Sequence, residues 1–301
     1  MTLVLLVLYL VAVGVLLPRR LAGSARLQAR PVTGAALWLA LMASFTVAAA
    51  LTAHHAVEPL THEPAGLLGL LPHAEPAGPV LPHTHDWWLL AAAGAAVAVL
   101  VAAVGLRTGR ARRRHRALLD VVAVRDRRWG ALVLEHAHPT VYCLPGRRSR
   151  IVLSRGALRL LDERQLAAAL AHEHGRIRGR HHLFRLPADT FALLLGPLPL
   201  ARLGRSEVAL LLEMAADDAA LAQVSRSELA SALYTLATFG ATPAPGGGTH
   251  GGTLGVASTG VLARVRRLAR PGGGRRRQRA WRLGLLALPV LPYLLACAPH
   301  P

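Results

Sequence analysis

The chain has 301 residues, of which 53% are apolar and 17% are charged. An apolar fraction this high excludes an intrinsically disordered protein, and two cysteines are too few for a disulfide-stapled secreted scaffold. The 35 basic residues are all arginine, and against 16 acidic residues they give a net charge of +19. Such a charge is typical of proteins that bind nucleic acid or an anionic surface, so the positions of the arginines decide between the two.

Four stretches are apolar enough to cross a membrane as helices. They are residues 2–17, 34–53, 87–106 and 283–298. A helix needs about 20 apolar residues to span a hydrocarbon core of about 30 Å, so the second and third stretches fit and the other two are short. The first has no basic stretch before it and no small-residue cleavage site before Pro18. We therefore interpret it as a retained span and not as a signal peptide.

Clusters of arginine follow the first and third stretches and precede the fourth, whereas residues 54–86 contain none. Because arginine-rich loops stay on the cytoplasmic side, residues 54–86 are predicted to form an extracytoplasmic loop. The sequence thus predicts a multi-pass protein of the cell membrane with four transmembrane helices: a three-helix region (1–106), a cytoplasmic domain (107–282) and a C-terminal transmembrane helix (283–301). The arginines then mark topology and contact membrane lipids, and no direct binding to nucleic acid is expected.

The predicted cytoplasmic domain is small and of the α+β type. Short β-branched or alternating runs predict strands over residues 121–124, 131–134, 140–143 and 150–153. Helices are predicted over residues 163–181, from after Ser206 to 224, over 227–239 and over 256–270, with Asp162 as the cap of the first. Residues 241–252, rich in Gly and Pro, predict a flexible loop. The apolar stretch 183–203 is interpreted as either a re-entrant or membrane-surface hairpin or a buried loop.

A His-Glu pair on the first predicted helix is the first candidate for chemistry. Metallopeptidases bind Zn²⁺ through two histidines at i and i+4 on one helix face, and a Glu beside the first His acts as general base. His172 and Glu173 supply half of this pattern, but the i+4 position is Arg176. On its own, such a pair is usually part of a polar surface.

Two acidic residues on the next predicted helix are the second candidate. Glu213 and Asp217 are four residues apart, and therefore on one face, at the end of an apolar run. Glu213 could ligate a metal while Asp217 orients a ligating imidazole. The alternative is a solvated acidic patch, although buried carboxylates need a cation or a hydrogen-bond partner.

Several motifs in this order resemble a known family, the BlaR/MecR-type integral-membrane zinc metallopeptidases. The motifs are Tyr142 to Ser154, Gly156 to Leu158, Ala171 to Glu173, Arg178 to His182 and Glu213 to Asp218. The resemblance covers about residues 121–236 and implies a gluzincin-like site in a zincin-like domain: His172 and Glu213 as zinc ligands, Glu173 as base and Asp217 as support. It also implies a protein or peptide substrate, which in relatives with a sensor is a cytoplasmic transcriptional repressor.

Arg176 departs from the family pattern, because members place the second zinc-binding histidine there and arginine does not give up its proton. Three interpretations follow. The site could be an active, irregular zinc site that uses water or His174 as the missing ligand. The chain could instead be an inactive pseudopeptidase that binds a signalling partner. Finally, Arg176 could pair with Glu213 or Asp217 in a metal-free ion pair that replaces the zinc.

The remaining histidines and cysteines are expected to be structural. Histidines recur through residues 54–86, where they could bind a metal, but a polar loop spaced by prolines is favoured. His136 and His138 alternate on a predicted strand. Cys143 and Cys297 lie far apart in the sequence and are interpreted as ordinary buried or membrane-facing residues.

Overall fold

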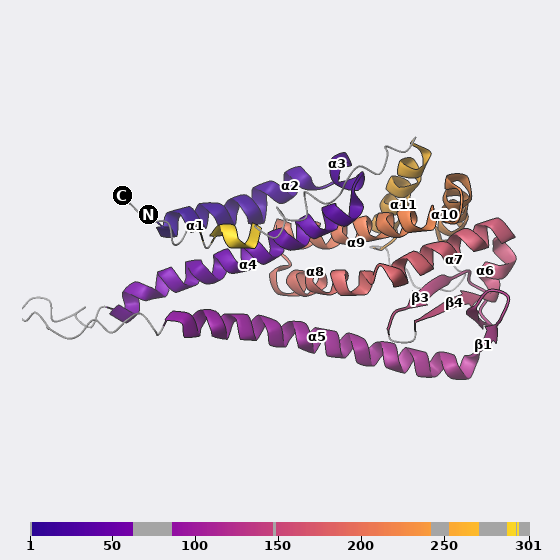
Figure 1. The fold of residues 1–301 in the computed structure, drawn as a ribbon, viewed down its shortest axis with the longest axis horizontal. Helices are drawn as coiled ribbons and strands as arrows, with labels where there is room; N and C mark the ends of the chain where they lie inside the picture. The colour runs from indigo at the N-terminus through magenta and orange to yellow at the C-terminus, as the bar shows by residue number, and fades with distance from the viewer. Residues whose placement is uncertain are drawn as a thin grey trace, which may run out of the picture.

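The computed structural model describes residues 2–62, 86–146, 149–241, 253–270, 288–292 and 294. The described chain is mainly helical and carries one four-stranded sheet, which lies at one end of the elongated molecule (Figure 1). The predicted combination of long helices with a small α+β region is confirmed at this level.

The N-terminal part forms long apolar helices. Helix α1 (Thr2–Val11), the π-helical turn η1 (Ala12–Leu16) and α2 (Leu17–Leu21) follow one another, and α3 (Ala25–Gln28), α4 (Pro31–His62) and α5 (Asp86–Val122) come next. Among the residues that the structure describes, three helices are long and apolar enough to cross a membrane, over Leu3–Leu21, Pro31–Ala56 and Gly94–Val122. They correspond to the first three predicted spans.

The fourth predicted span, residues 283–298, lies mostly outside the described residues. Its described part contains the short helix η2 (Leu288–Val290), and the Leu288 carbonyl accepts a hydrogen bond of 2.8 Å from the Ser44 hydroxyl. This contact places the C-terminal segment beside α4.

Two predicted boundaries were wrong because helices continue past them. Helix α5 was expected to end at residue 106, but it runs through the arginine-rich segment to Val122. Arginine has a high helix propensity, so the charge that marks the membrane boundary does not end the helix. Helix α4 extends to His62, so the predicted loop at 54–86 begins as helix, and residues 63–85 lie outside the described chain.

The four predicted strands are confirmed with small shifts of their ends. They are β1 (Ala123–Asp126), β2 (Ala131–Leu134), β3 (Val141–Leu144) and β4 (Arg150–Ser154), in the order β1-β2-β4-β3. Strand β2 pairs parallel to β4, and the β1–β2 and β3–β4 pairs are antiparallel. Strand β3 is therefore an edge strand. Leu119 of α5 packs on one face of the sheet, and Leu166 and Leu170 pack on the other.

Six α-helices of the described chain follow the sheet. They are α6 (Arg155–Leu160), α7 (Glu163–Arg178), α8 (His181–Leu195), α9 (Pro199–Ala220), α10 (Arg226–Ala241) and α11 (Thr253–Ala269). The predicted cap at Asp162 is confirmed, because its side chain and that of Gln165 each accept a hydrogen bond from the other's backbone amide. Helix α9 begins earlier than predicted, at Pro199, because a proline in the first turn needs no amide partner. Ser206 therefore lies inside α9, where its hydroxyl donates to the Leu203 carbonyl at 2.8 Å.

Of the two alternatives for residues 183–203, the buried loop was wrong. This stretch forms α8, a short turn and the start of α9. Helix α8 contains Pro187 on its exposed side, whereas Ala188 and Phe191 are buried against α4. Residues 183–203 are thus a helical hairpin that packs beside a candidate membrane span.

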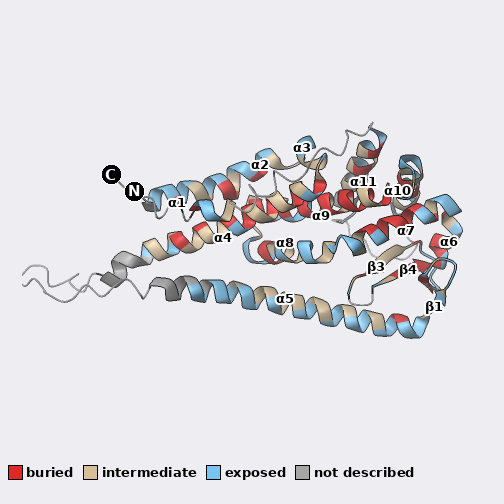
Figure 2. Ribbon diagram, in the orientation of Figure 1, coloured by how far each residue is buried: buried red, intermediate tan, exposed pale blue. Residues whose placement is uncertain are grey.

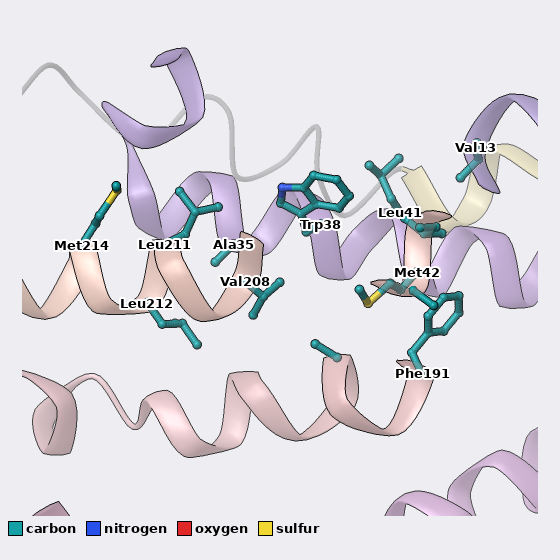
Figure 3. Packing of buried hydrophobic residues seen from close by; sticks show 13 residues of the cluster. Val13, Ala35, Trp38, Leu41, Met42, Phe191, Val208, Leu211, Leu212 and Met214 are labelled. Atoms are coloured by element: carbon teal, nitrogen blue, oxygen red, sulfur yellow. The ribbon is translucent and has the colours of Figure 1, made fainter. Parts of the chain in front are cut away.

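Helix α9 is the centre of the molecule, because it packs against α4, α7 and α8. Trp38, Leu41 and Met42 of α4 meet Val208 and Leu211 of α9 in the main apolar cluster (Figure 3). Buried residues concentrate on α9 and α7, whereas α5 is mostly exposed (Figure 2). An exposed apolar helix is expected where lipid is the solvent.

Helices α7 and α9 approach each other closely at Gly175. A Cβ atom there would lie 2.9 Å from the Ala216 carbonyl oxygen and 3.1 Å from the Ala219 Cβ. Since backbone atoms cannot move aside as a flexible side chain does, this glycine sets the distance between the two helices.

We predict that Gly175→Ala lowers the thermal unfolding temperature of the full chain in detergent, by an overpacking cost of about 1–3 kcal/mol. Gly109→Ala is the matched control, because a Cβ at Gly109 of α5 meets nothing within 4 Å. An equal change in the two variants would contradict close packing at the α7–α9 crossing.

Candidate functional site

The imidazole of His172 lies between two carboxylates of α9. Its Nδ1 is 2.9 Å from Asp217 Oδ1, and its Nε2 is 3.1 Å from Glu213 Oε2. His172 is 7% exposed and Asp217 1% exposed, so these groups meet away from water. The structure thus brings together the three predicted residues from α7 and α9.

Arg176 lies one helical turn after His172 and contacts both glutamates. Its Nη1 donates to the Glu173 carboxylate oxygens at 3.1 and 3.2 Å, and its Nε is 3.4 Å from Glu213 Oε1. The guanidinium therefore holds the predicted base and one predicted metal ligand together. This is the arrangement of the third interpretation, in which Arg176 pairs with Glu213.

A second arginine, Arg264 of α11, enters the same site and was not identified from the sequence. It donates two hydrogen bonds to Asp217, from Nε at 2.8 Å and from Nη2 at 2.7 Å, and its Nη1 is 3.6 Å from Glu213 Oε2. One signal was available: Arg264 is four residues before the buried Leu268, and so lies on the apolar face of an amphipathic helix.

A second arginine fork ties α11 to α9 beside the site. Arg267 donates to both carboxylate oxygens of Asp218 at 2.8 Å, and its Nε donates to the Gln28 carbonyl at 2.9 Å. Asp217 and Asp218 therefore fix α11 over the site, and Arg267 links α11 to the last residue of α3.

The protonation states follow from this packing. Burial alone would raise the pKa of Glu213, but the hydrogen bond with His172 and the charges of Arg176 and Arg264 lower it far below its ordinary value. Burial likewise opposes ionisation of Asp217, and the bonds to Arg264 and His172 lower its pKa. Burial would lower the pKa of His172, but its hydrogen bonds with Asp217 and Glu213 outweigh burial and raise it. Two ionised carboxylates therefore favour an imidazolium between them.

The charges of the site balance without any other ion. Three cationic groups, His172, Arg176 and Arg264, face three carboxylates, Glu173, Glu213 and Asp217. Nδ1 of His172 donates to Asp217, so the 3.4 Å approach of Arg264 Nη2 to Nδ1 brings two donors together and is not a hydrogen bond. A divalent cation would add two charges to a neutral cluster.

The residues present therefore do not fit a zinc ion. Zn²⁺ needs about four ligands, including neutral imidazoles or carboxylates, but a guanidinium stands at the second histidine position and Nε2 of His172 already faces Glu213. Two unit charges 4 Å apart repel by about 4 kcal/mol at an effective dielectric near 20, and a divalent ion doubles this. Within the described ranges, no three His, Cys, Asp or Glu side chains are grouped to hold a metal.

His174, the predicted substitute ligand, lies away from this site. Its Nδ1 hydrogen-bonds to the Leu170 carbonyl at 2.8 Å, and the side chain is exposed. It lines a separate cavity of about 590 Å³ with Asp120, Arg125 and Arg150. Residues two apart on a helix point about 200° apart, so regular helix keeps His174 from the ion pairs. A role for His174 as a ligand would require α7 to unwind.

His181 and Cys143 border the site but are not joined to it as ion pairs. Burial lowers the pKa of His181 to about 4, which keeps this imidazole neutral near pH 7. Burial and the nearby charge of Glu173 raise the pKa of the Cys143 thiol to about 12. Both groups are therefore uncharged, and Cys143 is the partly buried residue that the sequence predicted.

A cavity of about 140 Å³ opens beside the ion pairs. Its walls include His172, Glu173, Arg264 and Val141, so it reaches from the cluster to edge strand β3. The Ser154 amide donates to the Thr140 carbonyl, so Thr140 faces β4 with its backbone groups. In an antiparallel pair, successive residues point their backbone groups alternately toward and away from the partner strand. The backbone groups of Val141 and Cys143 therefore point away from β4. An edge strand beside a polar cavity is a template for an extended peptide.

Part of the chain is similar to a known peptidase family. Residues 106–232 match the model of peptidase family M48. The match covers the whole sheet and all of α7 and α9, and it suggests a metallopeptidase-type domain. No curated protein and no solved structure matches the chain. Arg264 lies beyond the matched residues.

We predict that Arg264→Gln strongly destabilises the protein, by about 3–5 kcal/mol, because it leaves Asp217 charged and buried without its strongest partner. The double variant Arg264→Leu, Asp217→Leu should recover much of this loss, since both charges are removed together. Unfolding temperatures of the two variants in detergent measure the difference. A single variant as stable as the wild type would show that the buried fork contributes nothing.

A stability maximum in weak acid is a further expected outcome. The fold lowers the pKa values of Glu213 and Asp217 from their ordinary values of 4.5 and 3.8. Both ionised carboxylates therefore stabilise the folded state at pH values above these, and this stabilisation is lost as the pH falls below them. The raised pKa of His172 stabilises the fold below 6.5, and this contribution is lost as the pH rises above it. Unfolding temperature against pH should therefore decline on both sides of this window, and His172→Gln should remove the decline above pH 6.5.

Proposed function

We propose that this chain is a membrane-embedded protein with a peptidase-type domain in which arginine ion pairs replace the zinc centre. The domain then acts as a pseudopeptidase that binds a protein segment without cleaving it. One observation carries the proposal: the Arg176 guanidinium bridges Glu173 and Glu213 from the position where a second histidine would be needed. Neither carboxylate is then free for hydrolytic chemistry.

The binding surface we propose is edge strand β3 with the adjoining cavity. An extended segment of a partner would add to β3 through the outward backbone groups of Val141 and Cys143. Its side chains would reach the cavity that His172, Glu173 and Arg264 line. The balanced charge of the ion pairs favours a neutral or weakly charged segment over a strongly acidic or basic one.

The proposed setting is the cell membrane, with the domain on the cytoplasmic side. The three candidate spans support a membrane location, and the arginines that follow the first and third spans support this orientation. By the resemblance to BlaR/MecR-type proteins, the partner would be a cytoplasmic regulator such as a transcriptional repressor. The protein would then function as a signalling module.

A second candidate function is an active zinc metalloendopeptidase of the BlaR/MecR type. The match to peptidase family M48 favours it, as does the retention of His172, Glu173, Glu213 and Asp217 in one cluster. This function requires Arg176 to leave the site, because its charge opposes a divalent ion and its fork holds both glutamates.

Zinc stoichiometry separates the two functions. We predict that the purified wild-type chain binds no zinc tightly after dialysis, whereas Arg176→His binds about one ion, because it removes a charge and adds an imidazole. The control is Arg178→His, which adds a histidine on an exposed part of the same helix. Metal content by mass spectrometry and cleavage of a casein substrate provide the measurements.

Stoichiometric zinc in the wild type, lost in His172→Ala, would favour the peptidase and contradict the pseudopeptidase. If Arg176→His remains folded and also binds no zinc, then His172 and Glu213 are not arranged as a remnant metal site.

A further inference from the structure

The tip of the α8–α9 hairpin is uncharged and apolar on its outer surface. Residues 190–201 contain no Asp, Glu, Lys or Arg. Leu193 and Leu194 near the end of α8 are 69% and 50% exposed. Leu193, Leu194 and Leu195 are consecutive, and exposing three neighbouring leucine side chains to water costs free energy. This exposure indicates that lipid or another protein surface covers them.

Contacts with the first span fix the depth of this tip. Leu198 Cδ1 lies 3.4 Å from the position of a Cβ on Gly14, in the middle of the span Leu3–Leu21. Gly14 is five residues before Arg19, which corresponds to about 8 Å of helix. Leu198 therefore lies about one and a half helical turns inside the first arginine of that span.

Contacts with the other two spans also place α8 within the layer that the spans occupy. Leu186 Cδ2 lies 3.5 Å from the position of a Cβ on Gly105, two residues before Arg107 of α5. From Leu186, α8 continues nine residues to Leu195, about 13 Å further along the layer that the spans occupy. The Phe191 ring meets Phe45 of α4 edge-on at 5.9 Å. Figure 1 shows α8 lying between α4 and α5.

Arginines mark the base of the hairpin at the level of those boundaries. Arg185, Arg202 and Arg205 are exposed, as are Arg19 and Arg20 at the end of the first span. Asp189 offsets part of this charge, with Arg205 Nε at 2.8 Å and Arg185 Nε at 3.6 Å. The base thus keeps an excess of positive charge in one layer, which complements anionic headgroups.

We propose that residues 190–201 are embedded in the membrane leaflet that faces the domain, and that the arginines at the base bind anionic phospholipid. By these contacts the tip enters the hydrocarbon by about 8–16 Å, so it does not cross a core of about 30 Å. The occupant of the exposed leucine face is lipid acyl chain, because the same face continues the surface of the three spans.

This position places the ion-pair site close to the membrane surface. His181, which borders the site, is four residues before Arg185 on α8, and Glu213 is eight residues after Arg205 on α9. These separations correspond to about 6 Å and 12 Å of helix. A segment that docks at β3 would therefore approach beside the lipid headgroups.

Spin-label accessibility tests the depth. In a Cys143→Ala, Cys297→Ala background reconstituted in nanodiscs, labels at Leu194→Cys, Val7→Cys and Ser206→Cys are compared. Val7 lies in the first span and is 44% exposed, and Ser206 is an exposed residue at the hairpin base. The Leu194 label should match Val7, accessible to oxygen and protected from a water-soluble nickel complex. A Leu194 label that behaves like Ser206 would overturn the insertion.

The unaltered chain provides a second measurement that does not depend on the cysteine background. Phosphatidylglycerol with a photoactivatable group in its acyl chain should crosslink to peptides that contain residues 190–201. Crosslinks confined to the three spans would contradict the proposal. It would also be contradicted if a second copy of the chain or another protein covered residues 190–201 and kept the lipid from crosslinking to them.

Lipid selectivity tests the arginines. The preference of bound lipid for phosphatidylglycerol over phosphatidylcholine should fall several-fold in Arg185→Gln, Arg202→Gln, Arg205→Gln. The matched control is Arg125→Gln, Arg127→Gln, Arg159→Gln, which removes the same charge from exposed positions on the sheet side of the domain. An equal change in both variants would show a net-charge effect and would overturn the assignment of a headgroup site.

Discussion

The pairing of Arg176 with Glu173 and Glu213 is the interaction on which the rest of the site depends. A guanidinium remains protonated under all conditions in which the protein folds, so the neighbouring groups always face a positive charge. With Arg264 and the imidazolium of His172, it neutralises three carboxylates, of which Glu173 and Asp217 are buried and Glu213 is partly exposed. A buried network is stable only when every member has its partner, and each member here has at least one.

Helix α9 joins this site to the membrane region. Its first half packs against α4 and carries Arg202 and Arg205 of the hairpin base. Its second half presents Glu213 and Asp217 to α7. Helix α11 is tied to the same stretch through Arg264 and Arg267, and Arg267 also reaches the last residue of α3. A shift of the first two spans would therefore be transmitted to the ion pairs through α9 and α11. The close α7–α9 crossing at Gly175 makes the site sensitive to such a shift.

Periodicity and composition were sufficient to predict much of the fold. The four strands, the cap at Asp162 and the first three spans follow from local patterns that the structure retains. Helix ends were predicted less well: charge marks where the membrane ends but does not break α5, and proline begins α9 instead of interrupting it. The 183–203 stretch was ambiguous because its apolar residues serve two neighbours, α4 on one side and the proposed lipid on the other.

The candidate site was predicted in part for a similar reason. Spacing identified the pairs His172–Glu173 and Glu213–Asp217, each on one helix, and the family resemblance joined the two pairs into one site. Arg264 could be recognised as an arginine on an apolar helix face, but its partner Asp217 is 47 residues away, so the sequence did not show which site it enters. Spacing also could not show whether Arg176 swings out to solvent or turns inward, since that depends on the distance to Glu213 across two helices.

The effect of a chelator on thermal unfolding tests the central claim most directly. If ion pairs hold α7, α9 and α11 together, the unfolding temperature of the purified wild-type chain at pH 7 stays the same with and without excess EDTA. Added zinc should leave it unchanged as well, because a ligand that stabilises must bind the folded state. A clear fall in the unfolding temperature with EDTA, restored by zinc, would show that a metal ion supports the site and would contradict the account.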